Sequence, residues 1–315
     1  MASSTPTSIL VLGAGELGMA VLRGLVKHSP PSTSITVLLQ PFSVHSPSPA
    51  KAEQLEKIRS LGVALLPGDL VASSAATLAD LFRPYHLIIG CTGFAVGGTG
   101  LQLKLCQAVL AANVPKYIPW QFGVDYDIIG RGSGQDLFDE QIDVRDLIRG
   151  QTKTKWVIIS TGMFTSFVFE REFGVVNMGE GRIEGSRPLV RALGGWDTEV
   201  TLTTPEDIGD LTARVVWEAP EVTNRIVYTA GDTISYERLA NVVEEVMGTE
   251  VRRELWDVDF LQRELDQHPD DSTSKYRLVF ARGHGVAWPV ETSFNAQKKI
   301  DVTEVERWAR ENLGK

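Results

Sequence analysis

Three glycines near the N-terminus form a pattern that could hold a phosphate group. Gly13, Gly15 and Gly18 make a Gly-x-Gly-x-x-Gly motif, which follows the apolar run 8–12 and opens a segment with helical periodicity at 19–26. In a strand, loop and helix of this kind, the first glycine permits a tight turn, the second lets a pyrophosphate approach the backbone, and the third lets the helix pack on the strand. The helix N-terminus offers unpaired N–H groups to the phosphates. The motif therefore predicts a dinucleotide site.

The end of the second predicted strand, at 34–39, indicates which dinucleotide is bound. Sites that prefer NAD usually place an acidic residue directly after this strand, to bind the ribose 2′-hydroxyl. Here the position is Gln40, no acidic residue occurs from Leu17 to Ala52, and Lys51 lies in the same interval. A 2′-phosphate would meet no like charge there, which favours NADPH over NADH. The alternative is that Gln40 only begins a solvated loop, rich in Pro and Ser, without touching the cofactor.

Strand-like and helix-like segments alternate through the first half of the chain, at lengths that suit right-handed β-α-β crossovers. Strands are expected at 8–12, 34–39, 63–66, 86–90, 116–119 and 155–159, and helices at 19–26, 50–61, 75–82, 101–112 and 137–149, whereas 41–49 is expected to be a loop. This pattern predicts an α/β fold with a Rossmann-like, doubly wound parallel sheet.

The second half of the chain is less regular. Residues 174–195 are rich in glycine and turn signals, while 204–209 indicates an N-capped helix start with a proline at its first position. We therefore expect residues 1–162 to form an NADP-binding Rossmann domain. Residues 163–315 are expected to form a smaller C-terminal substrate lobe, from which the elements at about 201–247 return to the sheet.

Composition and charge narrow the function classes. The 315 residues are 43% hydrophobic, enough for a full core, and the net charge of −9 argues against nucleic acid as a partner. No apolar run is long enough to cross a membrane and no signal peptide is visible, so a cytoplasmic location is expected. Cys91 and Cys106 lack the spacing of metal ligands and are expected to be buried thiols. No metal site is predicted.

Four motifs, taken together and in order, carry a family resemblance. They are Gly13–Gly18, Leu61-Gly62-Val63 with Gly68-Asp69-Leu70, Ile118-Pro119-Trp120-Gln121-Phe122-Gly123-Val124-Asp125, and Thr161-Gly162-Met163-Phe164. Over essentially its whole length the chain resembles the NmrA-like, isoflavone reductase-like group of atypical short-chain dehydrogenases/reductases, which includes phenylcoumaran benzylic ether reductases. The sequence Pro-Trp-Gln-Phe-Gly, where plant members read Pro-Ser-Glu-Phe-Gly, is similar to the fungal branch.

The resemblance implies an NADPH-dependent reductase of an aromatic or polyketide-like small molecule, a monomer or homodimer that acts in secondary metabolism. In the family an Arg and a Lys bind the 2′-phosphate; here Gln40 stands at the Arg position and Lys51 matches the Lys. The cofactor-binding residues expected are Gly13, Gly15, Glu16, Leu17, Gly18, Gln40, Lys51, Thr92, Gly93, Phe94, Gln121, Phe122, Gly162, Met163 and Phe164. The residues expected to line the substrate pocket are Trp120, Phe164 and Phe167.

One departure from the family concerns the acid–base chemistry. No tyrosine is followed by a lysine four residues later, so the usual Tyr-x-x-x-Lys pair is absent. The isoflavone reductase-like group instead carries a lysine on the helix after the Pro-x-x-Phe-Gly motif, and aligning that helix with 137–145 places Gln141 at the lysine position. Glutamine cannot exchange a proton at neutral pH, although its amide can hydrogen-bond a carbonyl or hydroxyl group.

Two accounts follow from this substitution. In the first, the protein is an oxidoreductase in which Gln141 orients an enone, quinone methide or ketone, and the proton comes from water, Tyr126, Asp125 or another nearby group. In the second, it is a catalytically silent NADP(H)-binding regulator, as NmrA-type regulators are.

Overall fold

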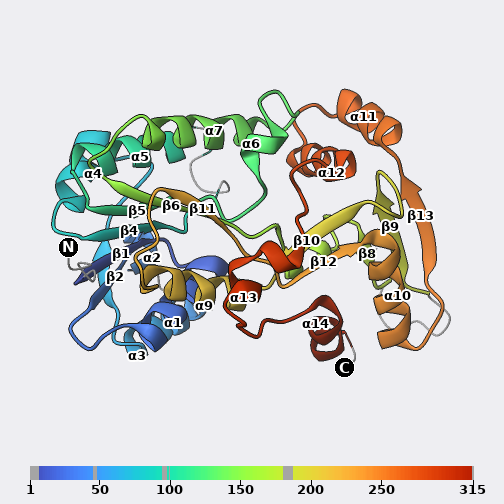
Figure 1. Ribbon diagram of the computed structural model, residues 1–315, viewed down its shortest axis with the longest axis horizontal. Coiled ribbons are helices and arrows are strands. Elements are labelled where there is room, and N and C mark those ends of the chain that lie inside the picture. Colours follow the sequence, from blue (N-terminus) through green and yellow to red (C-terminus); the bar gives the residue numbers. More distant parts are fainter. Residues whose placement is uncertain (1–6, 45–47, 94–97, 99, 180–186, 314–315) are drawn as a thin grey trace. The chain divides into compact units, whose positions relative to one another are not determined.

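The computed structural model describes residues 7–44, 48–93, 98, 100–179 and 187–313 (Figure 1). The chain divides into two compact units, and each of them is assembled from several segments. The first unit contains Met1–Phe122, Glu140–Ile159 and Glu206–Val227, and the second contains Gly123–Asp139, Ser160–Pro205 and Tyr228–Lys315.

A seven-stranded sheet forms the centre of the first unit, in the order β11-β6-β5-β4-β1-β2-β3. Its strands are β1 (Ser8–Leu12), β2 (Ser34–Leu39), β3 (Ala64–Pro67), β4 (Leu87–Gly90), β5 (Lys116–Ile118), β6 (Lys155–Ser160) and β11 (Arg225–Tyr228). β1 pairs in parallel with both β2 and β4, so that Ile9 is opposite Ile35 on one side and Leu87 on the other. The strand order changes direction at β1 and β4, which is where Rossmann-like sheets bind ligands. The predicted fold class is confirmed.

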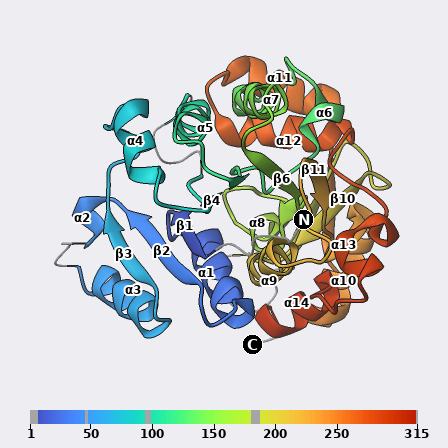
Figure 2. The same ribbon diagram turned by 60° about the vertical axis from the view of Figure 1, so that its left-hand side comes forward.

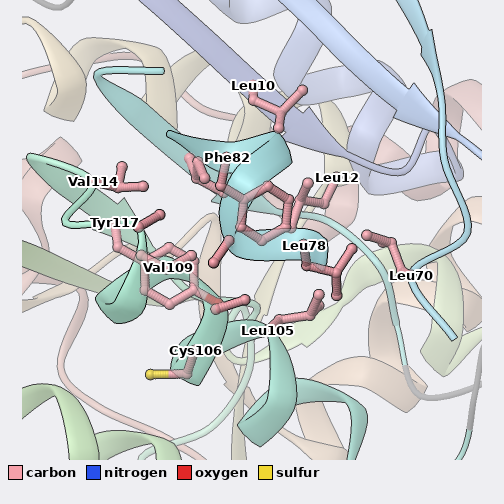
Figure 3. Packing of buried hydrophobic residues seen from close by; sticks show 14 of the residues in the cluster. Leu10, Leu12, Leu70, Leu78, Phe82, Leu105, Cys106, Val109, Val114 and Tyr117 are labelled. Carbon is pink, nitrogen blue, oxygen red and sulfur yellow. The ribbon is translucent and has the colours of Figure 1, made fainter. Parts of the chain in front are cut away.

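Helices cover both faces of this sheet (Figures 1 and 2). One face carries α4 (Ala75–Phe82), α5 (Leu101–Ala111) and α7 (Asp136–Arg149), and the other carries α1 (Glu16–His28), α3 (Pro49–Ser60) and α9 (Pro205–Val216). Alternate residues of β1 point to opposite faces, and Leu10 and Leu12 pack against Leu78, Phe82 and Leu105 (Figure 3). This apolar layer fixes the ends of the strands that carry the candidate site.

The helix after the glycine motif makes an unusually close contact with α9. A Cβ atom added at Gly24 of α1 would lie 2.2 Å from the carbonyl oxygen of Gly209, and one added at Gly209 would lie 2.2 Å from that of Ala20. Beside this crossing, the Asp210 carboxylate binds the side chains of Lys27 and His28, each at 2.7 Å. Burial raises the pKa of Asp210, but hydrogen bonds from Arg214, Lys27 and His28 outweigh it and hold that pKa well below its usual range. The returning segment 206–227 therefore holds α1 in place.

The second unit contains two three-stranded sheets, ordered β12-β10-β7 and β13-β9-β8. Their strands are β7 (Met163–Phe164), β8 (Val176–Asn177), β9 (Leu189–Leu193), β10 (Glu199–Thr203), β12 (Asp232–Ser235) and β13 (Arg252–Trp256). The helices of this unit are α6 (Tyr126–Ile129), α8 (Thr165–Val168), α10 (Tyr236–Met247), α11 (Val258–Gln267), α12 (Ser272–Arg282), α13 (Phe294–Gln297) and α14 (Val305–Asn312), with a 3₁₀ turn at Val290–Thr292.

The segment at about 201–247 divides between the two units. Residues 206–227, with α9 and β11, belong to the first unit, whereas β12 and α10 belong to the second. Among the residues described, no helix is long and apolar enough to cross a membrane.

Candidate functional site

The glycine motif forms the loop between β1 and α1, and its three glycines have different structural roles. Gly13 has φ +93°, and its N–H donates to the Leu38 carbonyl oxygen at 3.1 Å. A Cβ atom at Gly18 would lie 2.3 Å from the Gly13 carbonyl oxygen, so the packing of α1 on this loop excludes any larger residue. A Cβ atom at Gly15 would meet no protein atom within 4 Å. The folded chain therefore leaves open space over Gly15, as a pyrophosphate site requires.

A cavity of about 330 Å³ lies at this loop, along the carboxyl ends of the parallel strands. Its lining residues come from the end of β2 and the segment after it, from the loops after β1, β3 and β4, and from α3; they are Gly13, Ala14, Gly15, Leu38, Leu39, Gln40, Ser43, Lys51, Gln54, Leu55, Leu70, Cys91, Thr92 and Gly93. Six residues that the sequence assigned to the cofactor, Gly13, Gly15, Gln40, Lys51, Thr92 and Gly93, are thus brought together. The other members of the motif, Glu16, Leu17 and Gly18, lie at the start of α1.

The cavity is suited to an anion. Among the described residues that line it, Lys51 is the charged one, and none is a carboxylate. The Cys91 side chain is a neutral thiol, because burial raises its pKa far above the usual value. A phosphate group placed here would meet the Lys51 ammonium and no carboxylate among the described lining residues.

Ser43 and Gln54 also line the cavity, and the sequence reasoning missed both. The Lys51 ammonium donates to Gln54 Oε1 at 3.2 Å, and Gln54 Nε2 donates to the Ala14 carbonyl oxygen at 2.5 Å. Gln54 therefore connects the cation to the glycine loop. Lys51 and Gln54 are three residues apart on the helix predicted at 50–61, and this spacing was the sequence signal for their contact.

The prediction of a loop at 41–49 is wrong for residues 41–44. Residues Pro41–Val44 form the short helix α2, because the Gln40 carbonyl oxygen accepts hydrogen bonds from the N–H groups of Ser43 and Val44. This helix brings Ser43 to the cavity.

At the β4 end of the cavity, the loop that begins at Cys91 is fixed by side-chain hydrogen bonds. Thr92 Oγ1 donates to the Leu12 carbonyl oxygen at 2.9 Å, and Gln102 Nε2 donates to the Thr92 carbonyl oxygen at 2.8 Å. The indole of Trp120 lies against Gly93, 3.5 Å from the position of an added Cβ atom. Trp120 therefore lies beside the cavity. Phe94, also predicted to bind cofactor, lies outside the described residues.

Gln141 is on α7, and its side chain is 1% exposed. Neither Oε1 nor Nε2 of its amide has a hydrogen-bond partner among the residues that the structure describes. An amide that is buried and unbonded in this way is costly to the fold, and buried polar groups in native proteins normally have a hydrogen-bond partner. Gln121 and Phe122 are also buried, and neither is among the residues that line the cavity.

The remaining predicted residues lie in the second unit. Tyr126 is 4% exposed, and its ring packs edge-on against Phe138 with the centroids 5.0 Å apart. Phe167 packs against Phe173 at 4.6 Å and against Tyr276 at 6.2 Å. Burial, with a contribution from the charge of Tyr126, raises the pKa of Tyr276 well above its usual value. These contacts form an aromatic cluster around α12.

Two further predicted groups in this unit have structural partners. A Cβ atom at Gly162 would lie 2.1 Å from the Thr201 carbonyl oxygen, and the residue begins the turn that leads to Met163 and Phe164 of β7. The Asp125 carboxylate accepts hydrogen bonds from the Tyr228 hydroxyl at 2.5 Å and from the Asp127 N–H at 3.0 Å, where it caps α6. Within the described ranges, no group of His, Cys, Asp and Glu side chains could hold a metal ion.

The order of the central sheet and the glycine loop between β1 and α1 place this chain among the Rossmann-like folds. The chain belongs to the NmrA-like family, whose sequence profile matches residues 5–304. This confirms the resemblance drawn from the motifs.

Known relatives agree with this membership. The chain is 44% identical to an NmrA-like family domain-containing oxidoreductase of Gibberella moniliformis (strain M3125 / FGSC 7600), over 96% of this chain and 97% of the relative. It is 23% identical to phenylcoumaran benzylic ether reductase 1 of Arabidopsis thaliana, over 92% and 91% of the two chains. The solved binary complex of leucoanthocyanidin reductase with NADPH from Vitis vinifera has a similar fold, with a TM-score of 0.79 at 17% identity over 98% of this chain and all (100%) of that one.

Proposed function

We propose that this protein is an NADPH-dependent reductase of an aromatic or polyketide-like small molecule. The observation that carries the proposal is the open space over Gly15 within a cavity whose described lining holds the cation Lys51 and no carboxylate. The oxidoreductase and reductase relatives support it. In this proposal residues 1–162 supply the dinucleotide site, and residues 163–315 supply substrate contacts, with Phe167 among them.

The described residues fit the parts of the dinucleotide. The N–H groups of the loop after Gly13, from Ala14 to Gly18 at the N-terminus of α1, would hold the pyrophosphate. Lys51, Gln40 and Ser43 would hold the 2′-phosphate, and Thr92 and Gly93 would adjoin the nicotinamide half. We keep as proposals that Phe122, Gly162, Met163 and Phe164 contribute to the same site, whereas the Gln121 amide is bonded to Arg145 and to the backbone of α7.

The bound cofactor would supply a hydride, and the residues of this chain would orient the acceptor. In an enone or quinone methide, the hydride adds to carbon and the electron pair moves to oxygen, which gives an enolate or phenolate. The Gln141 amide would donate a hydrogen bond to that oxygen, and water would then protonate it. Such acceptors suit a site that places an amide where the family resemblance implies a lysine, because no side chain has to give up a proton.

The second candidate is a regulator that binds NADP(H) without turnover, and the amide at position 141 is the observation that favours it. Mixing the protein with NADPH and a panel of enones, quinones, quinone-methide precursors and aromatic ketones separates the two. Loss of NADPH absorbance with at least one acceptor supports the reductase. Tight NADPH binding with no oxidation across the panel supports the regulator.

Lys51 is expected to give the site its preference for NADPH. Lys51→Ala should weaken NADPH binding by about 10- to 100-fold, because a hydrogen bond between charged groups contributes about 1.5–3 kcal/mol. NADH affinity should change by less than about twofold, since NADH has no 2′-phosphate. Quenching of tryptophan fluorescence measures both affinities. Lys57→Ala is the matched control, because Lys57 lies on the same helix and pairs with Glu53. Equal affinities of the wild-type protein for NADPH and NADH would contradict the assignment.

Gln141 is expected to orient the substrate and not to transfer protons. Gln141→Ala should lower kcat by about tenfold, the scale of one neutral hydrogen bond. Cofactor affinity should stay unchanged in this variant and in Gln141→Lys, since the position is assigned to the substrate. A loss of kcat above about a hundredfold at unchanged cofactor affinity would indicate general acid–base catalysis through this position.

A further inference from the structure

A buried ring of hydrogen bonds ties the loop after β5 to the turn of α7 that carries Gln141. Arg145 Nε donates to Gln121 Oε1 at 2.7 Å, and Gln121 Nε2 donates to the backbone carbonyl oxygen of Gln141 at 2.8 Å. In the α-helix the same carbonyl is the i−4 acceptor for the N–H of Arg145, which closes the ring. Gln121 and Arg145 are both 0% exposed.

The two bonds of Gln121 need the two different ends of an amide. Its oxygen accepts from a guanidinium, and its nitrogen donates to a carbonyl. A glutamate at this position would keep the contact with Arg145 but would turn a second acceptor toward the carbonyl oxygen of Gln141. An apolar side chain of similar length would make neither bond.

The loop that carries Gln121 is itself fixed on the sheet. The N–H of Gln121 donates to the Pro119 carbonyl oxygen at 2.8 Å, and a Cβ atom at Gly90 of β4 would lie 2.8 Å from the Trp120 nitrogen. A glutamine anchored on such a loop is a rigid support for the helix that it contacts.

A second contact fixes the same turn of α7 from another element. The Glu140 carboxylate, which is 7% exposed, accepts from the N–H of Leu103 at 3.0 Å, in the first turn of α5. The backbone at 140–145 is therefore held by both the β5 loop and α5. The amide of Gln141, in contrast, makes no hydrogen bond to any residue in the described part of the chain. The described hydrogen bonds therefore restrain the backbone of this residue and not its side-chain amide.

We propose that Gln121 is a positioning residue that sets the place of the Gln141 amide for the substrate. It acts through the backbone of α7 and does not need to touch substrate or cofactor. This inference rests on the proposed reductase function, since it assigns a purpose to the unbonded amide of Gln141.

The test is a double-mutant cycle on kcat, carried out with the full-length protein. Gln121→Glu and Gln121→Met should each lower kcat by about tenfold, as Gln141→Ala does, with NADPH affinity within about twofold of wild type. In a Gln141→Ala background, the same changes at position 121 should lower kcat by less than about twofold, because the amide that they displace is gone. Additive losses, or equal losses of kcat and NADPH affinity, would overturn the positioning role.

Gln151→Glu is the control for a half-buried, fully hydrogen-bonded amide that directly follows α7. The amide nitrogen of Gln151 donates to the carbonyl oxygens of Ile148 and Thr154, and its oxygen accepts from the N–H groups of Lys153 and Thr154. This variant should lose stability to denaturant and keep kcat. If Gln121→Glu lost only stability in the same way, Gln121 would be a structural residue and the proposal would fail.

A second readout keeps the inference separate from the proposed activity. If none of the acceptors in the panel leads the wild-type protein to oxidise NADPH, the reductase function fails by itself. The side-chain amide NMR signals of Gln141, assigned by their loss in Gln141→Ala, then report its position. They should shift in Gln121→Glu and stay in place in Gln151→Glu, and unshifted signals in Gln121→Glu would overturn the proposal.

Discussion

Gly15→Val is expected to abolish NADPH binding in a protein that still folds. The backbone of Gly15 is extended, with φ −67° and ψ −165°, so it does not need the left-handed conformation that favours glycine, and an added Cβ atom there meets no protein atom within 4 Å. The new side chain would instead occupy the space assigned to the pyrophosphate. We expect affinity to fall by more than about a hundredfold, or about 2.7 kcal/mol. Titration with NADPH measures it, and chemical denaturation should show stability within about 1 kcal/mol of wild type.

Gly18→Ala is the matched control within the same motif. Its Cβ atom would lie 2.3 Å from the Gly13 carbonyl oxygen, so even the smallest side chain forces α1 away from the loop. We expect a loss of stability of about 1–3 kcal/mol or more, as for other overpacked sites. Unchanged NADPH binding in Gly15→Val, with Gly18→Ala destabilised, would mean that the loop serves only the fold.

The crossing of α1 and α9 is expected to be the most sensitive helix contact in the first unit. In an exposed helix, replacing glycine by alanine stabilises the protein by about 1 kcal/mol. At Gly209 the sign should reverse, because the methyl group would lie 2.2 Å from the backbone oxygen of Ala20. We expect Gly209→Ala, and equally Gly24→Ala, to lower the free energy of unfolding by about 3 kcal/mol, as measured by urea denaturation.

Asp210→Asn is the control for Gly209→Ala where α1 crosses α9. It weakens the ion pairs with Lys27 and Arg214 and the hydrogen bond with His28 but adds no volume, and the Asp210 side chain is 22% exposed. We expect a smaller loss, of about 1 kcal/mol. Stability of Gly209→Ala equal to or above wild type would show that α9 can move away from α1 without cost.

The fold was readily predicted from sequence because its signals are local. Alternating apolar runs and helical periodicity gave the order of strands and helices, and the glycine motif placed the first crossover. The contact between Gly24 and Gly209 could not be found in this way. Neither glycine belongs to a motif, and only the tertiary structure brings the two helices together.

The candidate site was predictable where backbone chemistry dictates the residue type, as at Gly13 and Gly15. Ser43 and Gln54 were missed, because their place in the cavity depends on a short helix and on a side-chain orientation that no periodicity encodes. For Gln121, the sequence motif and the observed side-chain contacts point to different partners. Its motif indicated a cofactor contact, whereas its amide is bonded to the guanidinium of Arg145 and the backbone of α7. A motif places a residue near a site, and packing decides what its side chain binds.

The return of residues 206–227 to the first unit affects how this protein is made. The chain between Gly24 and Gly209 is about 180 residues long, and ribosomes add roughly 5–20 residues per second. The face of α1 that α9 covers thus stays open for about 10 to 40 seconds after its own synthesis. The helix that begins at the glycine loop gains its partner only after the segment 160–205 of the second unit has been translated. A fragment that stops at residue 162 would keep that face exposed, and we expect it to bind chaperones or aggregate where the full chain does not.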